Sequence, residues 1–548
     1  MTWTQPLRRR RAGRDLAGRK REVERCLAQH GLLRRPRELP AGREDGAGEE
    51  GFGRRLRIAL DSLGPVFSCF AVYLGSRVDL LPAGDCLELA AAPERVAAVP
   101  IDLVRRRIAA ELGRPAEGVF ATLETEPYEA HLLVQTHRAR LRDGTPVLVR
   151  LADVDAEEAL AAELPALPVV AEAFAAGGFG AIALPAVIDD FSQAVRARTD
   201  FEFELKALDL LAGDAAAFGL LALPAGCREL ATARLLTTTD PGGAYLAEVG
   251  RSGSFPPGMR GRQELARRLC AVWLHQALLG RVFPAELRET GVQLLPSGQL
   301  SFLAGPFTRL AAAAQSNLRD FLVAVASGEP DDACAYLLRE TARQDEAASE
   351  AQLGSRLRQI VPFRDGAWSA SGESLAEHLF VYVRQARECG YWPRPHLVAF
   401  LRGLCAAASV ARRLSPEGDA LREGLQEVRL LAGMTQVRQA IDPAHWGSHL
   451  DRYAAAFVEM PQRLNELLML ADEGRARVRS ERLDEALPRR SQGMRSAALL
   501  MLMAVVVLVM HRLAGSGLSG AWPEAIAGLV FLVLGGLLLR GAAGRGRG

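Results

Sequence analysis

The stretch that decides the fold of the first half of the chain is residues 138–150, which read RARLRDGTPVLVR. Asp143 and Gly144 form an Asp-Gly pair, and such pairs favour a tight hairpin turn because both residues tolerate positive φ. Arginines alternate with apolar residues before the turn, and Val147, Leu148 and Val149 follow it. The pattern predicts two antiparallel strands joined at this turn, with Arg150 at the end of the second.

The composition describes a chain with enough apolar residues for a large core. It has 548 residues, of which 49% are hydrophobic, so one or two domains with appendages are expected. The formal net charge is only +2, but nearly all the cations are arginine and the lysines are Lys20 and Lys206. An ammonium group that binds phosphate as a point charge must come from those two positions, because arginine binds with a different geometry.

The cysteines are scattered and form no Cys-x-x-Cys pair, so a disulfide framework or a zinc site is not expected. They are Cys26, Cys69, Cys86, Cys227, Cys270, Cys334, Cys389 and Cys405. We expect buried thiols in a reducing compartment. The first residues are rich in arginine and no apolar segment follows them, which predicts no signal peptide and a cytosolic main body.

Two uncharged apolar segments, residues 497–510 and 525–539, stand near the end of the sequence. With their flanks each approaches the length of a membrane span, and a Gly- and Ser-containing turn separates them. Arginines precede the first segment and follow the second, which places both ends on the cytoplasmic side. The prediction is a transmembrane helical hairpin over residues 496–540; two buried helices of a soluble domain are the alternative.

Residues 1–50 are rich in Arg, Gly and Glu and have few aromatic residues. Such a composition predicts a basic, disordered N-terminal arm with one short helix near residues 19–30. A cationic arm near a membrane-anchored body would be attracted to anionic lipid, whereas a merely solvated arm is the simpler alternative.

Apolar residues recur at three- and four-residue spacing over much of the chain after residue 310, which predicts helices. The predicted helices are residues 318–326, 332–345, 374–388, 394–414 and 453–471. Arginines on them are most simply solvated helix faces. Nucleic-acid binding is not expected, because a concentrated basic surface with aromatic platforms is missing from the sequence.

Two segments, residues 63–67 (LGPVF) and 74–82 (LGSRVDLLP), resemble the opening signature of the UbiB/AarF family of atypical kinase-like proteins. In that family the intervening stretch carries a Lys-x-Gly-Gln motif, whereas this chain has Cys69-Phe70-Ala71-Val72. Residues 127–137 resemble the family's alanine-rich loop, of which Ala130, Gln135 and His137 are kept. Small residues in such a loop let backbone amides approach phosphate, and the bulkier residues here crowd that approach.

The resemblance implies a set of nucleotide-pocket positions. Arg150 stands where kinases have a phosphate-pairing lysine, and Glu204 stands at its helix-glutamate partner, so an ion pair between them is predicted. The family pairs the lysine of Lys-x-Gly-Gln with a glutamate of a Glu-x-Asp segment; here those two positions are Cys69 and Arg198, and Asp200 keeps the aspartate. Both halves of one interaction are replaced together, which indicates relaxed or redirected use of the site.

The segment that resembles the family's catalytic loop has lost most of its chemistry. Glu286 stands at the catalytic aspartate position, Gly291 at the metal-binding asparagine position, and Ala304 at the aspartate of Asp-Phe-Gly. Magnesium needs hard oxygen ligands, and the latter two side chains supply none. We therefore name Glu286 as a degenerate catalytic candidate, name Arg150, Glu204, Asp200 and Gln135 as nucleotide-pocket candidates, and expect no metal site.

The fold class that the resemblance implies is α+β: a two-lobed protein-kinase-like fold with a large helical C-terminal lobe, followed by the transmembrane hairpin. The predicted divisions are the arm (1–50), N-terminal helices with the kinase-like N-lobe (51–240), the mostly helical C-lobe (241–480), a charged linker (481–495) and the hairpin (496–540).

The function that the resemblance implies is a pseudokinase at the bacterial inner membrane, with its main body in the cytoplasm. It would act as a binding or organising module in isoprenoid-quinone (ubiquinone) biosynthesis or lipid handling, with membrane lipid, quinone-biosynthesis proteins or an isoprenoid lipid as partners. The alternative is an active ATPase or small-molecule kinase that uses ATP, magnesium and Glu286, with Glu289, Asp200 and Glu204 helping to hold the metal. A membrane protein of unrelated fold is a third interpretation.

Overall fold

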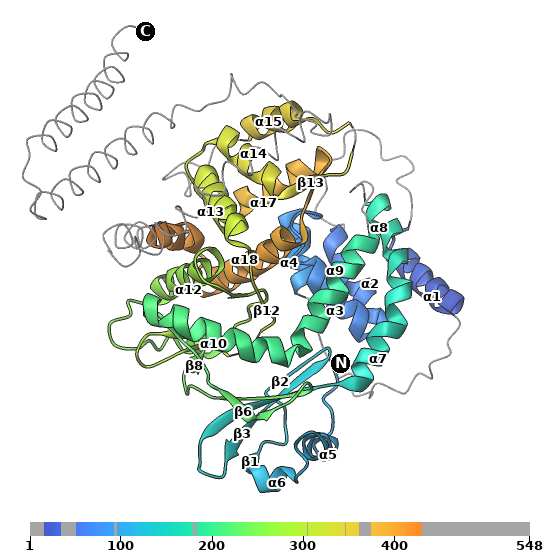
Figure 1. Cartoon of the computed structure of the whole chain (residues 1–548). Helices are drawn as coiled ribbons and strands as arrows, with labels where there is room; N and C mark the ends of the chain where they lie inside the picture. Colours follow the sequence, from blue (N-terminus) through green and yellow to red (C-terminus); the bar gives the residue numbers. More distant parts are fainter. Residues whose placement is uncertain are drawn as a thin grey trace, which may run out of the picture. The chain divides into compact units, whose positions relative to one another are not determined.

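The structure is a computed structural model that describes residues 16–33, 51–91, 96–177, 179, 184–303, 305–345, 347–360 and 374–429, with the backbone only at 216–218 (Figure 1). The chain divides into two units, Met1–Arg438 and Gln439–Gly548, and all of the described residues belong to the first. The predicted helix 453–471, the linker 481–495 and the hairpin 496–540 lie outside the described residues.

The predicted hairpin is present and forms the centre of a sheet. Strand β3 (Val134–Leu141) pairs antiparallel with β4 (Pro146–Ala152). Gly144 closes the turn at φ +87° and donates a hydrogen bond of 3.0 Å from its amide to the carbonyl of Leu141. Glycine suits this position because an L side chain rarely adopts positive φ. The Asp-Gly prediction is therefore confirmed at the level of the backbone.

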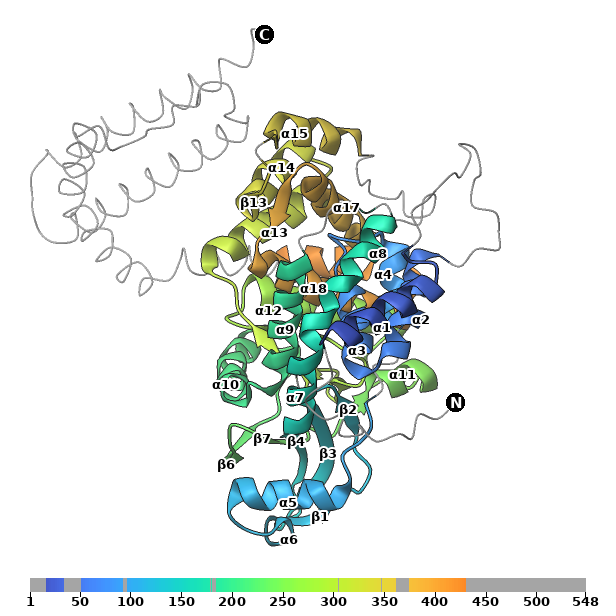
Figure 2. The same ribbon diagram turned by 90° about the vertical axis from the view of Figure 1, so that its right-hand side faces the viewer.

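The sheet around this hairpin is antiparallel throughout, in the order β1-β3-β4-β7-β6, with β2 paired to β3 at one side. Its remaining strands are β1 (Phe120–Leu123), β2 (Glu129–His131), β6 (Gly226–Ala231) and β7 (Leu235–Thr239). Helices α5 (Ile101–Leu112) and α6 (Ala116–Val119) lie against this sheet (Figure 2). Val104 and Ile108 of α5 are buried in one cluster with Val147 and Val149 of β4. That face is closed by the chain's own helices.

Of the predicted arm over residues 1–50, the structure describes residues 16–33, and the short helix predicted near residues 19–30 is present there; it packs into the core, however, and is not part of a solvated arm. Helix α1 (Leu16–Gln29) buries Val23 and Leu27 in the main core. The buried Arg19 donates hydrogen bonds of 2.7 Å to the carbonyl of Leu63 and to a carboxylate oxygen of Glu163. The low aromatic content misled the composition argument, because a short amphipathic helix needs only one apolar stripe to pack.

Three further helices continue from this region and pack closely: α2 (Phe52–Leu63), α3 (Pro65–Leu74) and α4 (Ala83–Ala90). Gly53 and Gly75 sit where these helices approach most closely. A Cβ at Gly75 would lie 2.5 Å from the backbone nitrogen of Ala90, and one at Gly53 would lie 2.6 Å from Cα of Asp85. Side chains at these two positions would force the helices apart.

The middle of the chain supplies a run of helices: α7 (Val154–Glu163), the 3-10 helix η1 (Leu164–Val169), α8 (Val170–Ala176), α9 (Leu184–Arg196), the 3-10 helix η2 (Ala197–Thr199) and α10 (Phe201–Phe218). Among the described residues one stretch, Val154–Ala176, is long and apolar enough to cross a membrane. Its residues Leu160 and Val170 belong to the main core, so length and composition are weak evidence for a span there.

Short strands frame the segment that resembles a catalytic loop. One sheet has the order β5-β11-β10-β8, and β9 pairs with β12 in a second. The elements are β5 (Leu221–Ala222), β8 (Ala244–Tyr245), α11 (Leu246–Ser252), α12 (Arg262–Leu278), β9 (Phe283–Pro284), β10 (Val292–Leu294), β11 (Leu300–Phe302) and β12 (Phe307–Thr308).

The last described elements are mostly helical, and Figure 1 shows several of them at the end of the described unit away from the large sheet. They are α13 (Ala312–Ala326), α14 (Pro330–Arg339), β13 (Thr341–Arg343), α15 (Glu350–Gln359), α17 (Leu375–Glu388), β14 (Tyr391–Pro393) and α18 (Pro395–Leu414). The predicted helix 332–345 is wrong in its second half, because Thr341–Arg343 pairs as a strand with Tyr391–Pro393. The helices predicted at 374–388 and 394–414 match α17 and α18 closely.

Candidate functional site

The segment that follows β9 is held rigidly from both sides. Trp273, fully buried on α12, donates from Nε1 to the carbonyl of Pro284 at 3.0 Å. The amide of Ala285 donates to the carbonyl of Pro306, and the amide of Leu303 donates to the carbonyl of Gly291. These bonds fix the backbone on either side of Glu286, so its side chain starts from a defined position.

Glu286 is surrounded by guanidinium groups from three parts of the chain. Arg198 Nε donates to its Oε2 at 3.1 Å, and Arg402 Nη2 donates to its Oε1 at 3.2 Å. Arg288 Nη2 lies 3.5 Å from Oε2. Both carboxylate oxygens are thus already hydrogen-bonded to cations. The sequence pattern identified Glu286 but placed Arg402, 116 residues further along the chain, on a solvated helix face; this is wrong, because Arg402 is buried and donates to Glu286.

Arg198 and Cys69 stand at the two positions where the family has a glutamate and a lysine that pair. Arg198 and Cys69 remain in contact, with Arg198 Nη1 at 3.6 Å from the sulfur of Cys69. The positive charge now belongs to the η2 segment instead of helix α3, and it is directed to Glu286. The two positions are therefore still in contact, but the cationic residue is now at position 198 instead of position 69.

The predicted ion pair between Arg150 and Glu204 is present, and both residues are buried. Arg150 also donates from Nη2 to the carbonyl of Arg198 at 3.4 Å and lies 5.2 Å above the ring of Phe201. Burial raises the pKa of Glu204, although the charge of Arg150 acts to lower it. The pair links β4 to α10, as a structural ion pair would.

The other two nucleotide-pocket candidates serve the local structure. The amide of Gln135 bridges to the backbone of Val99, accepting at 2.7 Å and donating at 3.2 Å, and lies 2.7 Å from Nε2 of His137. Asp200 caps helix α10, because its Oδ1 accepts from the amide of Phe203 at 3.0 Å. These hydrogen bonds occupy both side chains in the structure.

Arg150 and Leu148 lie on the same face of β4, and other side chains of the protein cover this face. Leu148 packs with Tyr245 and Leu303, and Tyr128 lies against the same cluster. The rings of Tyr128 and Tyr245 stack with centroids 4.7 Å apart. Kinases place a nucleotide between this strand and the catalytic segment. Here apolar and aromatic side chains of the chain itself pack between β4 and Leu303.

Two further contacts strengthen the covering of the β4 face. Tyr128 Oη donates to the carbonyl of Thr290 at 2.6 Å, which joins the strand region to the catalytic segment. Arg138 lies 4.5 Å above the Tyr128 ring and 5.1 Å from the Tyr245 ring centroid. Burial is the main reason that the pKa of Tyr128 is raised, so its hydroxyl stays protonated. The two tyrosines in the sequence gave no signal of this arrangement, because they are 117 positions apart.

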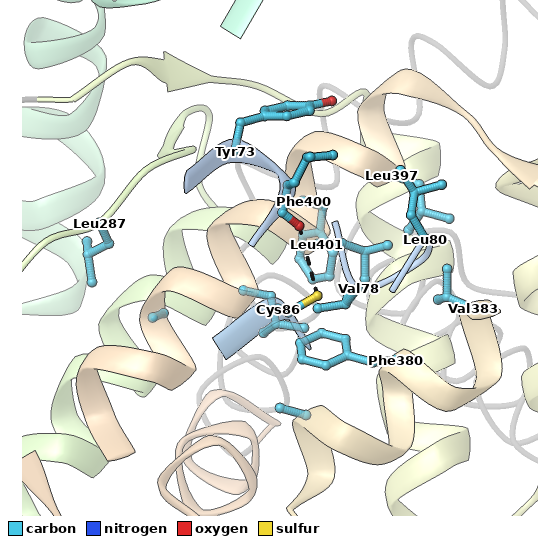
Figure 3. Close-up of a cluster of buried hydrophobic side chains, with 14 of the residues drawn as sticks. Tyr73, Val78, Leu80, Cys86, Leu287, Phe380, Val383, Leu397, Phe400 and Leu401 are labelled. Carbon is cyan, nitrogen blue, oxygen red and sulfur yellow. Dashed lines mark hydrogen bonds between the residues drawn. The ribbon is translucent and has the colours of Figure 1, made fainter. Parts of the chain in front are cut away.

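On the other side of the catalytic segment lies a cavity of about 760 Å³. Its wall comes from α3, α4, α9, α17 and α18, and its apolar part includes Val78, Cys86 and Phe380, which gather in Figure 3. Glu286 and Arg402 belong to its lining, whereas Arg150, Glu204, Asp200 and Gln135 do not. Sequence reasoning did not predict this cavity, since its wall combines elements that are distant in the sequence.

The carboxylates proposed for an unconventional metal site have other contacts. Glu289 pairs with Arg413, Glu204 pairs with Arg150, and Asp200 caps a helix. Across the described ranges no three His, Cys, Asp or Glu side chains come close enough together to hold a metal ion. Ala304 lies outside the described residues.

The ABC1 atypical kinase-like domain matches residues 92–336 of this chain. That match covers the large sheet, Glu286 and the strands around it, and similarity to proteins named UbiB accompanies it. Residues 92–336 therefore carry the domain of the UbiB/AarF family of atypical kinase-like proteins. Its mixture of helices and sheets is accordingly a kinase-like fold.

Individual relatives of this UbiB/AarF chain match over a limited span. A "Probable protein kinase UbiB" from Pseudomonas paraeruginosa is 38% identical over 119 residues, which cover 22% of each chain. One from Tolumonas auensis is 39% identical over 101 residues, covering 18% of this chain and 19% of that protein. The chain thus matches only about a fifth of the length of these curated bacterial relatives.

A solved structure is also similar. It is titled "The complex structure of Rv3197-erythromycin from Mycobacterium tuberculosis", with 14% identity and a TM-score of 0.36. The similarity covers 60% of this chain and 85% of the other, and it is too low to carry an argument.

Proposed function

We propose that this UbiB/AarF member is a pseudokinase that binds or organises other molecules at a membrane and transfers no phosphate. The observation that carries the proposal is the state of Glu286, whose two carboxylate oxygens accept hydrogen bonds from Arg198 and Arg402. A catalytic base must accept the proton of a substrate hydroxyl, and a metal ligand must offer a lone pair. In this arrangement Glu286 acts as the internal counter-ion of arginines.

The residues around Glu286 support the same proposal. Gly291 and Ala304 have no side-chain oxygen to offer magnesium at the positions where the family has asparagine and aspartate. Tyr128, Tyr245 and Leu148 occupy the region where a nucleotide would be expected. A site that no longer transfers phosphate is expected to lose its metal ligands, its catalytic base and the space for a nucleotide.

The wider role rests on family likeness. UbiB/AarF proteins are associated with isoprenoid-quinone biosynthesis and lipid handling, so we propose a quinone-pathway protein or an isoprenoid lipid as the partner class. The apolar segments within residues 496–540 would anchor the chain in the bacterial inner membrane, with the described unit in the cytoplasm. Membrane anchoring would bring a lipid-facing module close to its ligands.

The test is nucleotide binding by the full-length chain in a mild detergent. Thermal unfolding is followed with ATP and with ADP, each with and without magnesium, alongside ATP turnover. A ligand at a hundred times its Kd adds about 2.7 kcal/mol to the free energy of unfolding, so specific binding would raise the melting temperature visibly. We expect no shift and no turnover.

The control is Glu286→Gln, which keeps the shape of the side chain but removes its charge. A magnesium-dependent shift, with turnover that is lost in Glu286→Gln, would replace the pseudokinase by an active enzyme. Turnover that is equal in both proteins would instead indicate a contaminating ATPase, and the absence of nucleotide binding would then be judged from the thermal shifts.

A further inference from the structure

The cavity beside Glu286 has two chemically different parts. One wall is apolar and includes Val72, Val78, Cys86, Phe380 and Cys405. The opposite part is charged: Arg198, Arg288, Arg402, Arg412 and Arg413 line it together with Glu286, Glu289 and Glu377. A cavity of about 760 Å³ falls in the range of small-molecule sites, in which apolar walls are combined with a few polar groups.

The charges of the lining are unequal and lie at different depths. Arginines outnumber glutamates, so the cavity favours an anion. Arg198 and Arg402, the inner arginines, are each only 7% exposed, and both donate to Glu286. Arg412 and Arg413 are much more exposed and pair with Glu377 and Glu289 near the surface. The inner arginines are the ones that can bind a ligand with little competition from water.

Arg402 has an unused hydrogen-bond donor. Its Nη2 donates to Glu286, and its guanidinium carbon lies 5.2 Å from the centroid of the Tyr73 ring. Its Nε is shielded from solvent and has no hydrogen-bond partner in the part of the chain that the structure describes. A buried donor left without an acceptor is destabilising. A second acceptor at this guanidinium would relieve that cost.

The apolar wall continues to the surface. Leu87 on α4 lines the cavity and is 52% exposed, one of the few large apolar side chains that the described residues leave in solvent. Phe380 and Cys86, which lie close together in Figure 3, are buried residues of the same lining. A ligand with an extended apolar body can therefore lie along this wall, with its end near Leu87.

We propose that the cavity binds an amphipathic anion, with a carboxylate or phosphate head on Arg402 and Arg198 and an apolar body along the α3–α4 and α17–α18 wall. The head takes over hydrogen bonds that Glu286 holds in the structure, so Glu286 is the group that the ligand displaces. This inference deepens the proposed function by naming the ligand class of the module. It needs no nucleotide and no phosphoryl transfer.

The experiment is calorimetric titration of the full-length chain in dodecyl maltoside with water-soluble probes. Octyl phosphate and octanoate carry the two heads, octan-1-ol carries the body alone, and inorganic phosphate carries a head alone. We expect at least one of the two anions to bind, at least tenfold more tightly than octan-1-ol and inorganic phosphate. The stronger of the two identifies the head as phosphate or carboxylate. Titration into protein-free micelles is subtracted.

Variants separate binding in the cavity from adsorption elsewhere. Arg402→Gln removes the inner cation and Ala406→Phe fills the space beside it; each should weaken binding at least tenfold, and Arg402→Lys should restore part of it. Arg228→Gln is the matched control, because this exposed arginine pairs with Asp209 and does not line the cavity. Melting temperatures verify that each variant is folded, and the filling variant remains informative if Arg402→Gln is not.

Equal binding of octan-1-ol and the anions, or binding unchanged in both Arg402→Gln and Ala406→Phe, would overturn the proposal. The outcome is separate from that of the nucleotide test. If the protein binds the anion and also binds ATP with magnesium, this inference holds and the pseudokinase proposal fails. If it binds neither, this inference fails and the pseudokinase proposal holds.

Discussion

The two sides of the catalytic segment differ in how their space is used. On the β4 side, Leu148, Tyr128 and Tyr245 close the region, and Arg150 is committed to Glu204. On the side of α3, α4, α17 and α18 a cavity of about 760 Å³ remains, with Arg402 in its lining. The chain therefore packs its own side chains over β4 while a ligand-sized cavity remains on the other side, because different elements build the two walls.

The prediction with the largest expected effect tests whether the buried pair of Arg150 and Glu204 stabilises the fold. Arg150→Met leaves Glu204 buried without its cation, and such a change costs about 3–5 kcal/mol of unfolding free energy. The melting temperature of the full-length chain should fall strongly. Because burial already raises the pKa of Glu204, protonation at low pH should recover part of the loss.

The control for that prediction is the double variant Arg150→Met with Glu204→Leu, which replaces the pair by apolar groups and should recover most of the stability. A double variant that is as unstable as Arg150→Met, or a single variant as stable as the wild type, would show that the pair does not hold β4 to α10.

The second prediction concerns α12, the helix behind the catalytic segment. Burial lowers the pKa of His275 to about 4, from an ordinary value of 6.5. The unfolded state then binds a proton that the folded state does not, so stability is full above about pH 6.5 and falls as the pH approaches 4. The shift corresponds to roughly 3 kcal/mol at the acid end. Urea unfolding at several pH values measures it, and His275→Gln should flatten this part of the profile. An unchanged profile in that variant would assign the acid sensitivity to other groups.

The third prediction tests whether the cavity depends on the packing of α18 against the catalytic segment. Gly403 packs against Trp273, and a Cβ there would lie 2.7 Å from the indole Cζ2 and 3.1 Å from the Pro284 carbonyl oxygen. Gly403→Val should cost about 1–3 kcal/mol by overpacking and displace the neighbouring Arg402. We expect a lower melting temperature and weaker binding of octyl phosphate or octanoate. Gly354→Ala on α15, where the new methyl group meets little, is the control. Wild-type binding in Gly403→Val would separate the cavity from this contact.

The smallest effect examines the connection across the closed side. Tyr128→Phe removes the hydroxyl that donates to the Thr290 carbonyl at 2.6 Å and keeps the stack with Tyr245. The loss should be about 1 kcal/mol, the usual contribution of one hydrogen bond. Nucleotide binding should stay absent, because the ring still fills the region. A thermal shift with ATP in this variant alone would mean that the hydrogen bond, and not the filling, keeps nucleotide out.

Several features of the site were predictable because they depend on local pattern or aligned position. The hairpin at Asp143-Gly144 follows from turn chemistry, and the pairing of Arg150 with Glu204 follows from the resemblance. The short helix near residues 19–30 was predicted, but its burial was not, since α1 is stabilised by packing against α2 and η1, which the composition of the arm does not show. Residues 341–343 became a strand for a similar reason, because a distant partner segment was available.

The sequence by itself determined the antiparallel hairpin, most helices of the second half, and the replacement of the family's metal-binding and phosphate-binding residues. Turn preferences and apolar spacing act over a few residues, so they can be read locally. Only the tertiary structure decided that Arg198 and Arg402, 88 and 116 residues from Glu286, meet at its carboxylate, and that an apolar cavity lies beside them. Such contacts depend on how whole helices pack, which no short stretch of sequence specifies.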